Sequence, residues 1–201
     1  YIKDHSIDLV YTNTSTILCG GIAAKKNGVP SVFHIHEIPT GNKLYEFLSG
    51  KIINWYSSKV LTVSESVKKH WLKYIDDKKI ERIYNGIVFK KTDSIIKLER
   101  DQDDFVITSV ARLIPYKGHS YLIDIADELI KKSTKFKFLI VGDTLSSYVS
   151  YEKSVKQKVN DLGLENQIKF LGFRNDVSSI LKQSDLFIHP AISPDPLPTV
   201  L

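Results

Sequence analysis

The sequence predicts an α/β protein made of two domains, each a parallel sheet with helices packed on it. Short β-rich runs alternate with segments of helical spacing along almost the whole chain. Glycine, Asn-Gly or proline marks most of the junctions, as expected at helix ends and turns. The polar stretch at residues 87–104 interrupts the alternation, so we expect domains at residues 1–86 and 105–201 joined by a linker.

The first domain is expected to hold four strands and three helices. The strands are predicted at residues 7–11, 31–36, 59–63 and 82–84, and the helices at residues 16–26, 43–57 and 65–74. Asn27-Gly28 is a typical helix end, and Ser64 stands where an N-cap of the third helix would be. Asn85-Gly86 is a turn pair that closes the last strand.

The second domain is expected to repeat the alternation. Strands are predicted at residues 105–110, 136–141, 168–171 and 186–189, and helices at residues 118–132, 151–162 and 176–183. Apolar strands that alternate with helices indicate parallel sheets covered on both faces. In such sheets ligands bind beyond the carboxyl ends of the strands, so functional residues are expected just after each strand.

The helix predicted at residues 43–57 has two interpretations. Its apolar residues recur at helical spacing, and they are Leu44, Phe47, Leu48, Ile52 and Trp55. This pattern favours packing of that face on the sheet. Lysines 43, 51 and 59 recur among them, which also fits a helix that lies at a membrane surface.

Composition and charge narrow the class of protein. The 201 residues are 42% hydrophobic and 25% charged, which is typical of a folded domain, and no apolar run is long enough to span a bilayer. One cysteine, Cys19, cannot form an internal disulfide, so a cytoplasmic location is expected. The net charge is +6 over residues 1–98 and −1 over residues 99–201. The basic half suits an anionic partner, although charge spread this thinly slightly favours a solvated lysine surface.

Two cations flank the loop after the first strand of the second domain. In SVARLIPYKGH, Arg112 follows the strand and Lys117-Gly118 opens the next helix. They can converge on one point, where a helix N-terminus adds backbone N–H groups and partial positive charge. The spacing therefore fits a diphosphate site, but it also fits two unrelated surface cations.

Two further segments carry polar groups at strand ends. In PDPLPTVL, Asp195 precedes a predicted helix start, either as an ordinary cap or as a site acid. In HIHE, His34 and His36 share one face of a strand, with His36 at its carboxyl end. No further ligand stands nearby in the sequence, so we expect no metal there; we expect His34 in the core and His36 in recognition of polar groups.

Taken together, these segments resemble family 4 of the retaining glycosyltransferases, also called group 1, which has the GT-B fold. VARLIPYKGH resembles the family's G-R-L-x-x-x-K-G segment, with Ala111 where glycine is usual, and VFHIHE resembles its H-D/E strand end. VLTVSES, IYNGI, FLIVGD, IKFLGFRNDV and SDLFIHPAISPDPLPTVL resemble further segments, and the last leads into an E-x7-E motif. The segments occur in family order and at family spacing over nearly the whole chain.

The resemblance implies two Rossmann-like, doubly wound domains that face a cleft, and it implies roles for individual residues. Arg112 and Lys117 would hold the donor diphosphate in place of a metal, so no metal or other cofactor is expected. Asp195 would stand next to the donor sugar, where the family has glutamate, and His36 would act at the reaction centre. The donor-binding residues would be Gly142, Asp143, Phe173, Arg174, Leu197 and Thr199.

The resemblance also implies that the chain is a piece of a longer protein. The family's second glutamate would fall two residues past Leu201, and its glycine-rich loop would precede Tyr1. Both domains are therefore expected to be incomplete.

The implied activity is retaining transfer of a sugar from a nucleoside-diphosphate donor, with UDP the commonest carrier, to an acceptor hydroxyl. The acceptor would be a sugar or lipid-linked sugar in polysaccharide synthesis, with peripheral contact at the inner face of the membrane and no nucleic acid partner. Two alternatives remain: a nucleotide-sugar epimerase of the same fold, and a nucleotide-binding subunit without activity. The small number of candidate acids argues against the epimerase. Aspartate at position 195 favours the nucleotide-binding subunit without activity.

Overall fold

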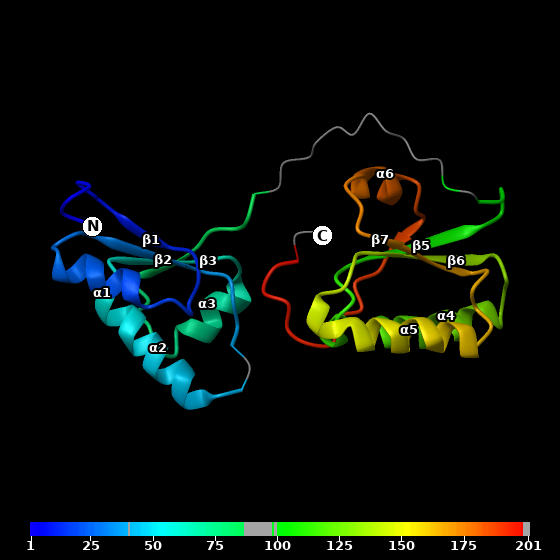
Figure 1. Ribbon diagram of the computed structural model, residues 1–201, viewed down its shortest axis with the longest axis horizontal. Coiled ribbons are helices and arrows are strands. Elements are labelled where there is room, and N and C mark those ends of the chain that lie inside the picture. Colours follow the sequence, from blue (N-terminus) through cyan, green and yellow to red (C-terminus); the bar gives the residue numbers. More distant parts are fainter. Residues whose placement is uncertain (40, 87–97, 99, 199–201) are drawn as a thin grey trace. The chain divides into compact units, whose positions relative to one another are not determined.

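The computed structural model describes residues 1–39, 41–86, 98 and 100–198 (Figure 1). The chain divides into two compact units, Tyr1–Ile87 with Pro194–Leu201 and Val88–Ser193. Most of the predicted linker, at residues 87–97 and 99, lies outside the described residues. The sequence prediction assigned all of residues 105–201 to the second domain; the structure instead groups Pro194–Leu201 with the first unit, where Leu197 packs against the buried core.

The first unit contains one parallel sheet with the strand order β1-β2-β3-β4. Its strands are β1 (Val10–Thr12), β2 (Ser31–Ile35), β3 (Lys59–Thr62) and β4 (Ile80–Arg82). Its helices are α1 (Cys19–Lys26), α2 (Lys43–Tyr56) and α3 (Glu65–Trp71). The Ser64 hydroxyl accepts a hydrogen bond from the Val67 N–H at 3.3 Å, so the predicted N-cap of α3 is confirmed.

All three helices of the first unit lie on one face of its sheet (Figure 1). The strands follow one another in chain order, and right-handed connections in a constant direction place every helix on the same side. The buried core between sheet and helices includes Phe33, Ile35, Val60, Val67 and Trp71. Helices on both faces were predicted, and in the described part of this unit the helices cover one face.

Helix α2 does not pack on the sheet through its predicted apolar face. Leu44, Phe47, Leu48 and Trp55 are exposed, and the buried residues of the helix are Glu46, Ser49, Gly50 and Ile53. Gly50 explains this orientation, because a Cβ at that position would overlap the side chain of Tyr74. The helix therefore approaches its neighbours through its small residues, and its large side chains are left outside.

The second unit contains a parallel sheet with the order β7-β6-β5-β8. Its strands are β5 (Phe105–Val110), β6 (Phe136–Val141), β7 (Ile168–Gly172) and β8 (Leu186–Phe187). Its α-helices are α4 (His119–Ile130), α5 (Val149–Asp161) and α6 (Val177–Lys182), with 3-10 turns η1 (Pro115–Lys117) and η2 (Ser146–Tyr148). The predicted fold class, α/β with parallel sheets, is confirmed.

The strand order of the second unit reverses direction once, and this reversal positions the candidate site. The chain steps outward from β5 to β6 and β7, then returns to place β8 on the other side of β5. Helices α4 and α5 therefore cover one face of the sheet and α6 the other (Figure 1). Between β5 and β8 lies a topological switch point, the place where open α/β sheets bind ligands.

Several predicted boundaries differ from the structure by a few residues. Strand β4 ends at Arg82, although residues 82–84 were predicted, and α4 begins at His119 after the separate turn η1. The last strand was predicted to reach His189 but ends at Phe187. Pro190 follows closely and has no N–H, so it cannot extend the ladder.

Candidate functional site

The loop after β5 carries Arg112 and Lys117 at the switch point of the second unit. Between them, Leu113 and Ile114 are each only 2% exposed and fix the middle of the loop in the core. Arg112 is exposed and Lys117 is partly buried at the end of η1. The two cations therefore stand on opposite ends of one short, internally anchored loop, as the sequence predicted.

The chain after β8 packs against the same loop. Gly118 has φ of 75°, and a Cβ at this position would overlap the carbonyl oxygen of Pro190. The Ile192 N–H also donates a hydrogen bond to the Tyr116 carbonyl oxygen at 3.0 Å. Because of this contact, the amino end of α4 lies directly beside the chain that leaves β8.

The first residue of α4 is a fully buried histidine that the sequence analysis did not select. His119 is 0% exposed, and neither ring nitrogen has a hydrogen-bond partner among the described residues. Burial, and then the charges of Lys117 and His189, lower its pKa to about 4. The imidazole is therefore neutral at pH 7. A signal was present, because His119 precedes Leu122, Ile123 and Ala126 at the spacing of one buried helix face.

His119 should make the stability of the protein depend on pH. In the unfolded chain its pKa is near 6.5, so between pH 6.5 and about 4 the unfolded state binds a proton that the folded state does not. We expect the free energy of unfolding to fall as the pH drops through this window, and to fall less in His119→Leu. Urea unfolding of both proteins at pH 7 and pH 5 measures the difference. Equal losses in the two proteins would contradict the prediction.

Glycine 142 joins the loops that follow β5, β6 and β7. It has φ of 137°, and a Cβ would overlap the carbonyl oxygen of Ala111. Its N–H donates a hydrogen bond to the Gly172 carbonyl oxygen at 2.8 Å. The glycine was selected for close approach to a nucleotide, and the structure shows that the fold of this edge requires it as well.

Asp143 and Thr144 hold the β5 loop from the neighbouring strand end. The Leu113 N–H donates to the Asp143 carbonyl oxygen at 3.0 Å, and the Thr144 hydroxyl donates to the Leu113 carbonyl oxygen at 3.0 Å. The exposed Asp143 carboxylate accepts a hydrogen bond from the Thr144 N–H at 2.8 Å. Thr144 was missed by sequence reasoning, since a single threonine after a strand carries no distinctive pattern.

Phe173 and Arg174 follow β7 on the same edge of the sheet. The Phe173 ring is 71% exposed, which makes it available for stacking. Arg174 forms a bidentate pair with the buried carboxylate of Asp176, at 2.8 Å and 2.9 Å. This pair holds the guanidinium at the start of α6.

The remaining predicted residues of the carboxyl-terminal segment are grouped with the first unit or lie outside the described residues. Asp195 and Leu197 are partly buried and belong to the segment grouped with the first unit. Thr199 lies outside the described residues. The structure therefore brings together six of the predicted residues at the carboxyl edge of one sheet, and they are Arg112, Lys117, Gly142, Asp143, Phe173 and Arg174.

His36 stands at the carboxyl end of β2 in the first unit. Its Nε2 lies 2.9 Å from the Asn13 Oδ1, and its ring lies 4.3 Å from that of His34, measured between centroids. His34 is half-buried on the face opposite Phe33 and Ile35, so the expectation of a core histidine is wrong. Desolvation, and then the nearby His36, lower the pKa of His34.

Glu37 organises the loop that faces His36, and sequence reasoning did not select it for the site. Its carboxylate accepts hydrogen bonds from the Thr14 hydroxyl at 2.6 Å and from the Ser15 N–H and hydroxyl, each at 3.1 Å. The Trp71 indole N–H donates to the Glu37 carbonyl oxygen at 3.0 Å. Glu37 thus fixes the loop that presents Asn13 to His36. The only sequence signal was its position next to His36 at a strand end.

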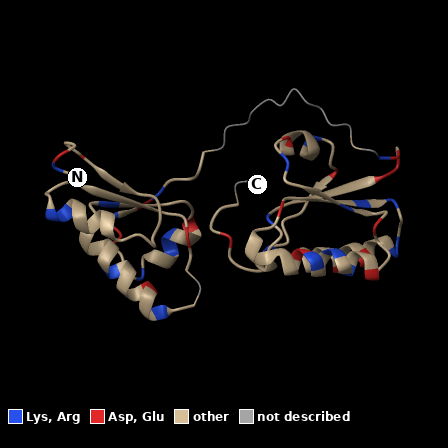
Figure 2. Cartoon of the chain, in the orientation of Figure 1, with Lys and Arg blue, Asp and Glu red and all other residues tan. Residues whose placement is uncertain are grey.

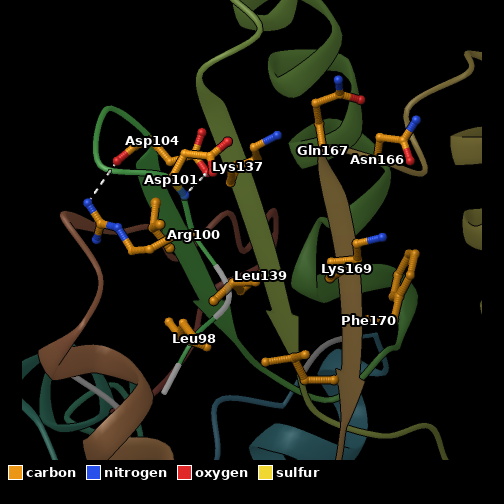
Figure 3. Close-up of a pocket in the computed structure, with 12 residues that line it drawn as sticks. Leu98, Arg100, Asp101, Asp104, Lys137, Leu139, Asn166, Gln167, Lys169 and Phe170 are labelled. Carbon is orange, nitrogen blue, oxygen red and sulfur yellow. Dashed lines mark hydrogen bonds between the residues drawn. The ribbon is translucent and has the colours of Figure 1, made fainter. Parts of the chain in front are cut away.

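A separate cavity of about 760 Å³ opens on the sheet of the second unit, near the amino ends of β5, β6 and β7 (Figure 3). At the margin of the cavity, the Arg100 guanidinium donates a hydrogen bond to the Asp104 carbonyl oxygen at 2.8 Å. None of the predicted site residues lines this cavity. Within the described part of the chain, no group of three or more His, Cys, Asp or Glu is placed to hold a metal, and no helix has the length and hydropathy needed to cross a membrane.

Two family profiles together cover the chain. Residues 90–201 match the family described as Glycosyl transferases group 1, and residues 1–90 match Glycosyltransferase Family 4. One similar protein is the UDP-Gal:alpha-D-GlcNAc-diphosphoundecaprenol alpha-1,3-galactosyltransferase of Escherichia coli. It is 29% identical over 218 residues, which cover 95% of this chain and 54% of that protein. The Staphylococcus aureus capsular polysaccharide biosynthesis glycosyltransferase CapH is 28% identical over 142 residues, covering 70% of this chain and 38% of that protein.

Solved structures of similar fold include Alr3699/HepE from Anabaena, crystallised in complex with UDP. It matches with a TM-score of 0.87 at 30% identity, covering 98% of this chain and 57% of that chain. A glycosyltransferase from Rickettsia africae has the same fold, with a TM-score of 0.79, 24% identity, and coverage of 96% of this chain and 54% of that chain. The chain therefore spans about half the length of the Escherichia coli relative and of these two solved structures.

Proposed function

The chain belongs to the glycosyl transferases group 1, and from that premise we propose that the whole protein transfers a hexose from a UDP-sugar to an acceptor hydroxyl. We propose that the transfer retains the anomeric configuration and needs no divalent metal. The observation that carries the proposal is the placement of Arg112 and Lys117 at the switch point between β5 and β8. Support for UDP comes from Alr3699/HepE, whose crystal structures contain UDP or UDP-glucose.

The two cations would bind the diphosphate and stabilise it as it leaves. During transfer the bond between C1 of the sugar and the β-phosphate oxygen breaks, and negative charge develops on that oxygen. Arg112 and Lys117, together with the first N–H groups of α4, would stabilise that charge in place of a metal ion. His119, buried at the start of α4, is neutral at pH 7 and adds no charge to this site.

The other predicted residues take the roles that the family resemblance implies. Gly142 and Asp143 would border the nucleotide, and Phe173 and Arg174 its base. Leu197 and Thr199 would offer backbone N–H groups to phosphate or sugar, and Asp195 would stand near the donor sugar. His36 would contact the donor sugar or acceptor, held in place by Asn13 and, through the loop, by Glu37.

In the retaining step the acceptor oxygen would attack C1 on the face from which UDP departs. The new bond joins the acceptor oxygen to C1, and the acceptor proton passes to the departing phosphate oxygen. This balance requires no oxidant, reductant or additional nucleophile.

The acceptor is proposed to be a lipid-linked or surface polysaccharide. The Escherichia coli relative is named for an undecaprenol-diphosphate substrate, and the Staphylococcus aureus relative for capsular polysaccharide biosynthesis. We place the protein in the cytoplasm, with peripheral contact at the inner face of the membrane, because a lipid-linked acceptor would be reached there.

Release of UDP by the full-length protein tests this function. A panel of UDP-, GDP- and ADP-sugars is supplied with and without lipid-linked acceptor, and the anomer of the product is determined. We expect UDP release that depends on the acceptor and a product that retains the donor configuration. A chelator should lower the rate by less than about tenfold, which corresponds to about 1.4 kcal/mol of barrier. A larger loss, or an inverted product, would contradict the corresponding part of the proposal.

A further inference from the structure

Helix α2 presents a continuous stripe of large apolar side chains outward. Leu44, Phe47, Leu48 and Trp55 are 65%, 47%, 50% and 68% exposed. With Lys51, they occupy positions i, i+3, i+4, i+7 and i+11 of the helix, which places all five on one side. Soluble proteins bury such stripes, so an exposed one marks a surface that binds something apolar.

The opposite side of α2 is held by specific contacts, so the helix cannot simply turn its stripe inward. The Glu46 carboxylate is buried and lies 3.5 Å from the His70 Nε2 and 3.5 Å from the Tyr74 hydroxyl. Gly50 lies against Tyr74 with no room for a side chain. Rotation of the helix would separate Glu46 from these partners and would press large side chains against Tyr74.

The charges around the stripe are positive. Lys43 and Lys51 extend from α2, and the ammonium of Lys25 on α1 lies 4.5 Å from the centre of the Trp55 ring. None of these three lysines forms an ion pair with a described residue, and the one acid of α2, Glu46, is buried. Figure 2 shows basic residues in blue along α1 and α2, and in these two helices all of them are lysines. Lys59, the third lysine of the predicted pattern, lies on β3 and pairs with Glu81 at 2.9 Å, so it is not part of this surface.

We propose that the outward stripe of α2, made of Leu44, Phe47, Leu48, Lys51 and Trp55, is a docking surface for an anionic lipid bilayer. The apolar side chains enter the boundary between headgroups and acyl chains, and Lys43, Lys51 and Lys25 contact the lipid phosphates. The proposed function includes a peripheral contact with the membrane, and the stripe of α2 is the surface that would make it. This assignment rests on the proposed function only for the location of the membrane.

The chemistry of the stripe favours a bilayer over a second copy of this chain. A twofold contact of the stripe with itself would place lysine opposite lysine, with no acid on the surface to pair with them. Helix α4 offers a contrast in the same chain. It exposes Tyr121 and Ile125, but the acids Asp124, Asp127 and Glu128 lie among them, and an anionic bilayer would repel these.

The two tryptophans of the chain provide a direct test. Trp55 lies in the stripe, whereas Trp71 is 0% exposed in the core. The full-length protein is mixed with vesicles of phosphatidylglycerol and phosphatidylcholine, some of them carrying brominated acyl chains. We expect a blue shift and quenching of Trp55 fluorescence, both absent in Trp55→Phe, while sedimentation shows that this variant still binds. Vesicles of phosphatidylcholine alone should bind weakly.

Matched variants distinguish vesicle binding through the stripe from binding that depends only on the positive charge of the protein. Lys43→Ala and Lys51→Ala should each weaken binding about fivefold, and Leu44→Ala and Leu48→Ala should each weaken it roughly tenfold. Ile125→Ala on α4 is the control and should bind as the parent does. Circular dichroism checks the fold; if a leucine variant does not fold, the lysine variants and the Trp55 quenching still decide the question.

Three results would overturn the proposal. They are no association with anionic vesicles, association that the α2 variants leave unchanged, and a dimer in solution that Leu48→Ala dissociates, which would assign the stripe to a second copy. UDP release by the full-length protein is measured in parallel with a water-soluble acceptor. Loss of vesicle binding with normal UDP release counts against the surface alone, whereas absence of UDP release counts against the proposed transfer.

Discussion

Lys117→Ala and Arg112→Ala should each lower the rate of sugar transfer by roughly 10²–10³ in the full-length protein, because each removes a charge that would stabilise the departing diphosphate. Both side chains extend from a loop fixed by the buried Leu113 and Ile114, so the fold should survive either change. The turnover number should fall along with the ratio of turnover number to Michaelis constant, since the charge on the leaving oxygen develops mainly in the transition state. Steady-state UDP release measures both quantities.

Lys153→Ala is the matched control for this prediction. Lys153 is an exposed cation on α5 in the same unit, so its loss changes the net charge equally without touching the switch point. It should leave the rate unchanged. Near-normal turnover by either the Lys117 or the Arg112 variant would show that the diphosphate is bound elsewhere.

Gly118→Ala should destabilise the second unit by roughly 2–5 kcal/mol, the sum of left-handed strain and a backbone overlap. Gly118 has φ of 75°, and a Cβ there would overlap the carbonyl oxygen of Pro190. The chain after β8 or the amino end of α4 would have to move, so UDP binding should weaken as well. Urea unfolding gives the stability change, and calorimetry with UDP gives the change in affinity.

Gly163→Ala separates the two causes of the expected destabilisation, left-handed strain and backbone overlap. Gly163 lies in the same unit with φ of 66°, but nothing lies within 4 Å of the position its Cβ would take. Its substitution should therefore cost only the left-handed strain, about 1–2 kcal/mol. If both variants lose the same free energy of unfolding, the contact between Gly118 and Pro190 is not important for stability.

Much of the secondary structure was predictable because its signals are local. The strands at Phe105–Val110 and Phe136–Val141 lie where the apolar runs placed them. Ser64 caps α3 as expected. The rule that sites follow parallel strands also selected Arg112 and Lys117 as candidates, since it needs only the position of each strand end along the chain.

Residues that act through distant partners were not predictable in this way. Glu37 matters through Thr14 and Ser15, which lie more than twenty positions earlier in the chain. Thr144 matters through the carbonyl oxygen of Leu113 on the neighbouring strand end. Nothing in the local sequence shows that such pairs meet, because their contacts depend on which strands are neighbours.

The sequence by itself determined the alternation of strands and helices, the position of the basic loop at a strand end and the family resemblance, because short-range periodicity and motifs carry all three. The tertiary structure alone decided that β8 lies beside β5, which turns the loop of Arg112 and Lys117 into a switch point. It also decided which side of α2 is buried. Hydrophobic periodicity assumes that the apolar side faces inward, but here the close approach at Gly50 and the polar partners of Glu46 outweigh that preference, and the apolar stripe is left exposed.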